Sequence, residues 1–66
     1  MTHSEEKTVD WMDSLFTKAL SDDRLTVALL RNWLKFERTR NERGETSAAL
    51  FTAYESLVQE YEAVLS

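Results

Sequence analysis

The chain has 66 residues, a formal net charge of −4, no cysteine, no proline, one glycine and one histidine. These counts exclude disulfides, thiol chemistry and a glycine-rich phosphate loop, and a metal site would need carboxylates around the one histidine. A chain of this size buries only about 60% of its unfolded surface, so a regular helical core or association with another chain must stabilise it.

The composition favours one globular domain over residues 1–66. The apolar fraction of 42% is near the globular norm. No apolar run approaches the roughly 18 residues of a membrane span. The first residues do not have the basic and apolar pattern of a signal peptide. We therefore expect a cytoplasmic protein that has no membrane partner.

Residues 5–20 predict the first helix. Thr2 and Glu5 have the spacing of a capping box, and early acids suit the positive end of a helix dipole. At about 100° per residue, half of the circumference is apolar and contains Val9, Trp11, Met12, Leu15, Phe16, Ala19 and Leu20. This pattern predicts an amphipathic helix with a single core face.

Residues 23–43 predict the second helix. Ser21, Asp22 and Asp23 offer side-chain oxygens for its N-cap, and Asp22 or Ser21 is expected to cap it. Gly44 follows the last turn, where a left-handed residue commonly ends a helix.

The second helix is apolar on two separate faces. The face expected to meet the core contains Leu25, Ala28, Leu29, Trp33 and Phe36. A row centred about 165° away contains Val27, Leu30 and Leu34. Because one bundle core cannot cover both, we expect this row to be an interaction surface, most simply a two-fold dimer seam. The alternative is a splayed arrangement, in which the first helix covers one side of the second and the third helix covers the other.

Residues 47–65 predict the third helix, with a cap among Glu45, Thr46 and Ser47. Its one apolar face includes Phe51, Tyr54, Val58, Tyr61 and Leu65. The connection at 41–46 is short, so the second and third helices are expected to form an antiparallel hairpin with the shorter first helix docked on it. The predicted fold is all-α, a three-helix domain that dimerises into a larger bundle.

No residue set supports catalysis. His3 has Ser4 and Glu5 beside it, but a chain terminus does not provide the rigid frame that a catalytic set needs. The acidic pairs lie at helix starts or on polar faces, where acids are ordinarily found. We expect no enzyme activity, no metal, no cofactor and no small-molecule substrate.

Charge is distributed unevenly. Residues 1–20 have four acids and two bases, 21–43 have four acids and six bases, and 44–66 have four acids and no base. A stripe about 60° wide on the second helix contains Arg24, Arg31, Lys35 and Arg38, the candidates for polar or anion contacts. Such a stripe can follow phosphates, but pairing with carboxylates of the first or third helix is the simpler expectation.

The sequence predicts a small non-enzymatic protein–protein interaction module: a regulator, adaptor or inhibitor. We expect it to bind a partner protein, or a second copy of itself as a homodimer, through Val27, Leu30, Trp33 and Leu34. One alternative is a nucleic-acid-binding protein that uses the basic stripe. Another is an acidic mimic of nucleic acid formed by the first and third helices.

Overall fold

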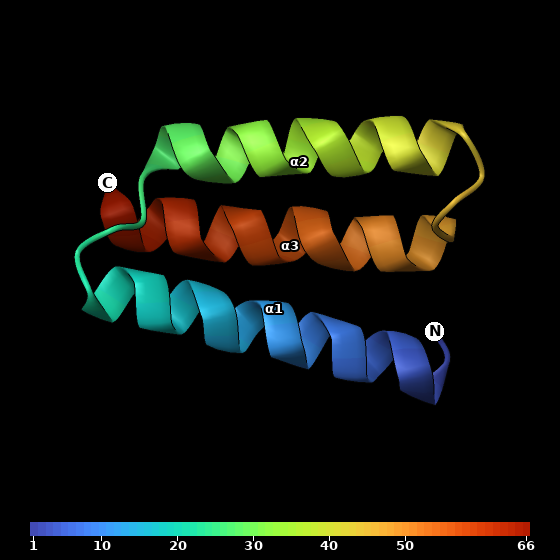
Figure 1. The fold of residues 1–66 in the computed structure, drawn as a ribbon, viewed down its shortest axis with the longest axis horizontal. Helices are drawn as coiled ribbons and strands as arrows, with labels where there is room; N and C mark the ends of the chain where they lie inside the picture. The colour runs from blue at the N-terminus through green and yellow to red at the C-terminus, as the bar shows by residue number, and fades with distance from the viewer.

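The computed structural model, which describes residues 1–66, contains three helices and no strand (Figure 1). The helices are α1 (His3–Ser21), α2 (Val27–Glu42) and α3 (Ala48–Leu65). Both α1 and α2 pack against α3, and the chain reverses its direction at each connection. The prediction of a compact all-α, three-helix domain is therefore confirmed. None of the three helices combines the length and the apolar character that crossing a membrane requires.

Two of the predicted helix starts are confirmed. Thr2 and Glu5 form a capping box at α1. Ser47 caps α3, since its hydroxyl accepts a hydrogen bond from the Leu50 amide at 3.1 Å. The Ser47 hydroxyl also donates to the Glu5 carboxylate, which ties the start of α1 to the start of α3. That hydrogen bond, together with the one from the Thr2 backbone, lowers the pKa of Glu5.

The predicted start of α2 is wrong. Thr26, rather than a residue at 21–23, caps α2 by accepting from the Leu29 amide at 3.1 Å. Asp23 has a left-handed backbone with φ 61°. The Asp23 amide donates to the Leu20 carbonyl at 3.1 Å, and the Arg24 amide donates to the Ala19 carbonyl at 2.8 Å. This is a Schellman motif, so the polar segment ends α1 instead of beginning α2.

The predicted end of α2 is confirmed by the same motif. Gly44 has φ 75°. Its amide donates to the Asn41 carbonyl at 3.0 Å, and the Glu45 amide donates to the Arg40 carbonyl at 3.0 Å. A Cβ on Gly44 would meet no atom within 4 Å, so its backbone angle rather than space favours glycine here.

The core lies where the apolar sides of the three helices meet. Its buried residues are Phe16, Leu25, Leu30, Leu57, Val58 and Tyr61. The aromatic rings pack edge to face: the ring centroid of Phe16 lies 5.1 Å from that of Trp33 and 5.5 Å from that of Tyr61. Edge-to-face pairs of this kind add to the stabilisation from buried area. The contact between Phe16 and Trp33 joins α1 to α2.

The two apolar faces of α2 are largely reversed relative to the prediction, although Leu25 and Trp33 of the expected core face do meet the core. Leu30 is 0% exposed, and Leu34 packs against the core. Leu29 is 49% and Phe36 is 62% exposed. The physical cause is that α2 begins at Val27, so Leu25 reaches the core from the connection before the helix and does not indicate which helical face is buried. On the helix itself, α3 covers the Leu30 side.

Candidate functional site

Four large apolar side chains are exposed on α1 and α2. On α1 these are Trp11, which is 61% exposed, and Leu15, which is 42% exposed. They lie four positions apart and therefore on one side of the helix. On α2, Leu29 and Phe36 are seven positions apart and also share a side. We call the surface of Trp11, Leu15, Leu29 and Phe36 the α1–α2 face.

The contacts with α3 show how the α1 half of this surface is oriented. Phe16 points into the core, so its neighbours Leu15 and Thr17 lie about 100° to either side. The Thr17 hydroxyl lies 2.6 Å from the Tyr61 hydroxyl of α3. Leu15 therefore lies on the side of α1 that is turned away from α3.

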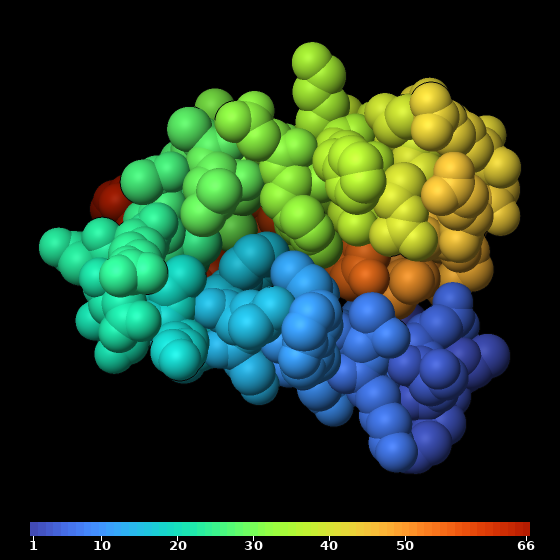
Figure 2. All heavy atoms as spheres, in the orientation of Figure 1, coloured from blue at the N-terminus to red at the C-terminus, as the bar shows by residue number.

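The α2 half follows the same geometry. Leu30 points into the core, and its neighbours Leu29 and Arg31 lie about 100° to either side. Arg31 pairs with Glu62 of α3 at 3.3 Å, so Leu29 is turned away from α3. Figure 2 looks onto this side of the molecule, with α1 and α2 in front and α3 behind them.

The charges around the α1–α2 face are mainly positive. Residues three, four or seven positions away on a helix are surface neighbours of a side chain. The charged residues at these spacings from the four apolar side chains are Lys7, Lys18, Asp22, Arg40 and Arg43. Arg40 has Glu37 and Glu45 as partners, so the unpaired charges at these spacings are three cations and one acid, Asp22, in a chain whose net charge is −4.

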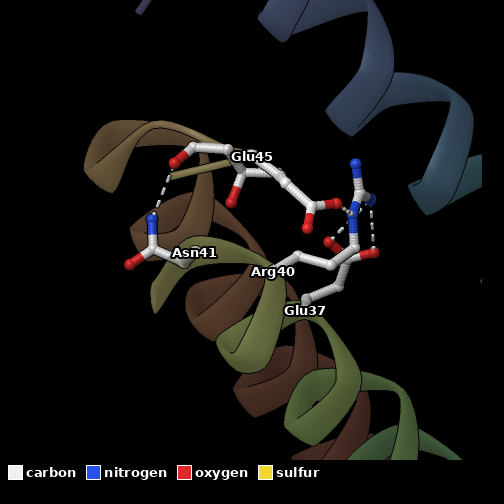
Figure 3. Close-up of polar contacts among 5 residues, drawn as sticks. Glu37, Arg40, Asn41 and Glu45 are labelled. Atoms are coloured by element: carbon white, nitrogen blue, oxygen red, sulfur yellow. Dashed lines mark hydrogen bonds and ion pairs between the residues drawn. The ribbon is translucent and has the colours of Figure 1, made fainter. Parts of the chain in front are cut away.

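Arg40, one of these cations, forms ion pairs within the chain. Arg40 donates to both oxygens of the Glu37 carboxylate at 3.1 and 3.2 Å and lies 3.5 Å from Glu45 (Figure 3). Glu37 is only 5% exposed, and its charge raises the pKa of Arg40. Lys7, Lys18 and Arg43 form no ion pair.

The predicted basic stripe lies on another side of α2. Arg31 is paired with Glu62 of α3, as the simpler expectation required. The Arg38 guanidinium lies 5.8 Å from the centre of the Phe51 ring, which is a cation–π contact. Arg24 and Lys35 form no ion pair. Arg31, Leu34, Lys35 and Arg38 line a surface hollow of about 340 Å³.

The residues predicted as an interface are partly or fully covered within the chain. Leu30 is inside the core, and Val27 and Leu34 are half-buried. Trp33 is also half-buried, because its ring packs on Phe16 and on Tyr54, whose centroid is 4.7 Å away.

Sequence reasoning missed the four residues of the α1–α2 face. One signal was present, since Trp11 lies at the edge of the apolar half of α1, farthest from Phe16. Leu29 and Phe36 carried no such signal, because they resemble core residues on the helical wheel.

Carboxylates gather on the other side of α1. Asp10, Asp13 and Glu60 border a hollow of about 390 Å³ between α1 and α3. The Tyr61 hydroxyl donates to Asp13 at the edge of this hollow. No three acidic, histidine or cysteine side chains in the chain are placed to hold a metal ion.

No protein-family model, curated protein or solved structure matches this chain. We therefore infer the function from the surface of the molecule.

Proposed function

We propose that this protein is a small interaction module that binds a partner protein through the α1–α2 face. The observation that supports the proposal is the exposure of Trp11 and Phe36 beside Leu15 and Leu29. An aromatic side chain has about 150–250 Å² of surface, so the exposed parts of Trp11 and Phe36 alone come to roughly 250 Å², and the two leucines add to it. Patches of about 300–600 Å² are the largest on a typical monomer and are often functional.

Core contacts hold the two helices beneath the face. Phe16 anchors α1 next to Leu15, and Trp33 anchors α2 between Leu29 and Phe36. A surface whose helices are already fixed loses little conformational entropy on binding. Exposed tryptophan is also among the side chains that most often contribute most of the binding free energy.

This surface replaces the one predicted from the sequence. A dimer seam through Val27, Leu30 and Leu34 would require Leu30, which is 0% exposed, to leave the core. Nucleic-acid binding has less support, because Arg31 is paired with Glu62 and the net charge is −4.

Capture from a lysate of the source organism tests the proposal when it is done with matched variants. The bait is compared with Trp11→Ser/Phe36→Ser and with Val64→Ser, a control on α3 whose side chain is 65% exposed. We expect a protein that the unmodified chain and Val64→Ser retain and that the double variant loses. Equal retention by all three baits contradicts the proposal.

A further inference from the structure

We infer that the partner of the α1–α2 face is an acidic amphipathic helical segment of another protein. Its apolar side would cover Trp11, Leu15, Leu29 and Phe36, and its carboxylates would meet Lys7, Lys18 and Arg43. The inference rests on the proposed function and adds the chemical class of the partner.

The cations that border the α1–α2 face favour an acidic partner. Lys7 is four positions before Trp11, and Lys18 is three positions after Leu15, so both border the apolar patch on α1. Arg43 is seven positions after Phe36 and borders the patch on α2. All three are exposed and have no ion pair within the chain. They outnumber Asp22, the one unpaired acid at these spacings, so an acidic partner would gain complementary charge around the apolar contact.

A second copy of this chain is a poor occupant. A face-to-face dimer would bring the cations of both copies to the same rim, and like charges across an interface oppose association. A partner with carboxylates around its apolar side would avoid this repulsion.

A helical segment matches the length of the face. Leu29 and Phe36 are two turns apart, or about 10 Å along α2, the spacing of apolar positions i and i+7 on a partner helix. An anionic bilayer would meet the same cations. The net charge of −4 opposes binding to an anionic surface, and phosphatidylserine vesicles distinguish the two ligands.

Two synthetic peptides test the inference. Each has about 18 residues, so that it can form a helix, with leucines at i, i+3, i+4 and i+7. One carries glutamate and the other lysine at its polar positions. Binding to the full chain is followed by fluorescence anisotropy of the labelled peptide. We expect the glutamate peptide to bind and the lysine peptide not to bind.

Variants define the site. Two variants should each lower the affinity for the glutamate peptide at least tenfold: Lys7→Glu/Lys18→Glu/Arg43→Glu and Trp11→Ser/Phe36→Ser. Arg31→Glu/Lys35→Glu, on the basic stripe, should leave its affinity within about twofold, since rim charges act over a limited distance. Helical circular dichroism equal to that of the unmodified chain shows that a variant is folded.

The outcomes separate the two proposals. Equal binding of both peptides overturns the acidic partner and leaves the proposed function standing. No binding of either peptide also overturns it, and the capture experiment then decides the proposed function alone. Binding to phosphatidylserine vesicles in place of the glutamate peptide overturns both proposals. Self-association that Trp11→Ser/Phe36→Ser abolishes replaces the acidic partner with a second copy.

Discussion

Asp23 and Gly44 occupy equivalent positions after two helices. Both have a left-handed backbone, with φ 61° and 75°, and both donate their amide to a carbonyl of the last turn. A left-handed conformation costs a residue with a Cβ about 1–2 kcal/mol, although aspartate tolerates it better than most. Aspartate also places a negative charge at the negative end of the α1 dipole.

Asp23→Gly should therefore raise the free energy of unfolding by about 0.5–1 kcal/mol. Asp23→Asn is the control, since it removes the charge and keeps the Cβ. Urea unfolding followed by circular dichroism measures both. A glycine variant no more stable than the unmodified chain would show that the left-handed backbone is not strained.

Because of Tyr61, the stability of the fold is expected to decrease at alkaline pH. Burial, followed by the hydrogen bond to Asp13, raises the pKa of Tyr61 above its ordinary value of 10.0. The folded state therefore keeps the phenol proton at a pH where the unfolded state loses it. This contribution to stability is complete below about pH 10 and is lost as the pH rises through the folded pKa.

The free energy of unfolding should fall as the pH rises above about 10, and it should fall less in Tyr61→Phe. At pH 7 the same variant should lose about 1 kcal/mol, because its hydrogen bonds to Asp13 and Thr17 are removed. Burial also raises the pKa of Tyr54, so part of the alkaline loss remains in the variant. Urea titrations at each pH provide the comparison, and identical pH profiles would refute the role of Tyr61.

At the scale of the element, the orientation of α2 decides which of its apolar residues are buried and which are exposed on the α1–α2 face. Leu30→Ala should cost about 2–5 kcal/mol, since it empties space in the core, whereas Leu29→Ala should cost less than about 1 kcal/mol. The two leucines are adjacent and chemically identical, so each is the control for the other. Thermal unfolding of both variants is sufficient, and the reverse order would mean that the predicted faces were right.

The helix ends show how much the sequence determines locally. Thr2 with Glu5, Ser47 and Gly44 each satisfy backbone groups of their own helix, so short patterns predict them. Ser21, Asp22 and Asp23 suit either the end of one helix or the start of the next. The choice was made by Thr26, which caps α2 farther along the chain.

The faces of α2 could not be read in the same way. Both contain leucine, and Trp33 lies between them, so helical periodicity ranks them about equally. The choice depends on α3, which meets the Leu30 side, and on the contact of Phe16 with Trp33. The candidate surface was missed for the same reason, because its residues become visible only after the core has been assigned.

At the scale of the whole molecule, charges of opposite sign lie on different sides. Asp10, Asp13 and Glu60 border the α1–α3 hollow, and the basic stripe runs along α2. With a net charge of −4 and Arg31 paired, we expect no measurable binding of duplex or single-stranded DNA or RNA near physiological salt. Anisotropy with labelled oligonucleotides checks this. Micromolar binding that weakens with salt and disappears in Arg31→Glu/Lys35→Glu would move the function to the stripe.

The most direct test of the α1–α2 face is a map of binding on the ¹⁵N-labelled protein. The glutamate peptide is titrated in while amide chemical shifts are recorded for the whole chain. We predict the largest chemical-shift changes at the amides around Trp11 and Leu15 on α1 and around Phe36 on α2, and at the Trp11 indole. We predict small changes on the outer side of α3. Changes centred on Arg31, Lys35 and Arg38, or spread evenly over all three helices, would contradict this prediction.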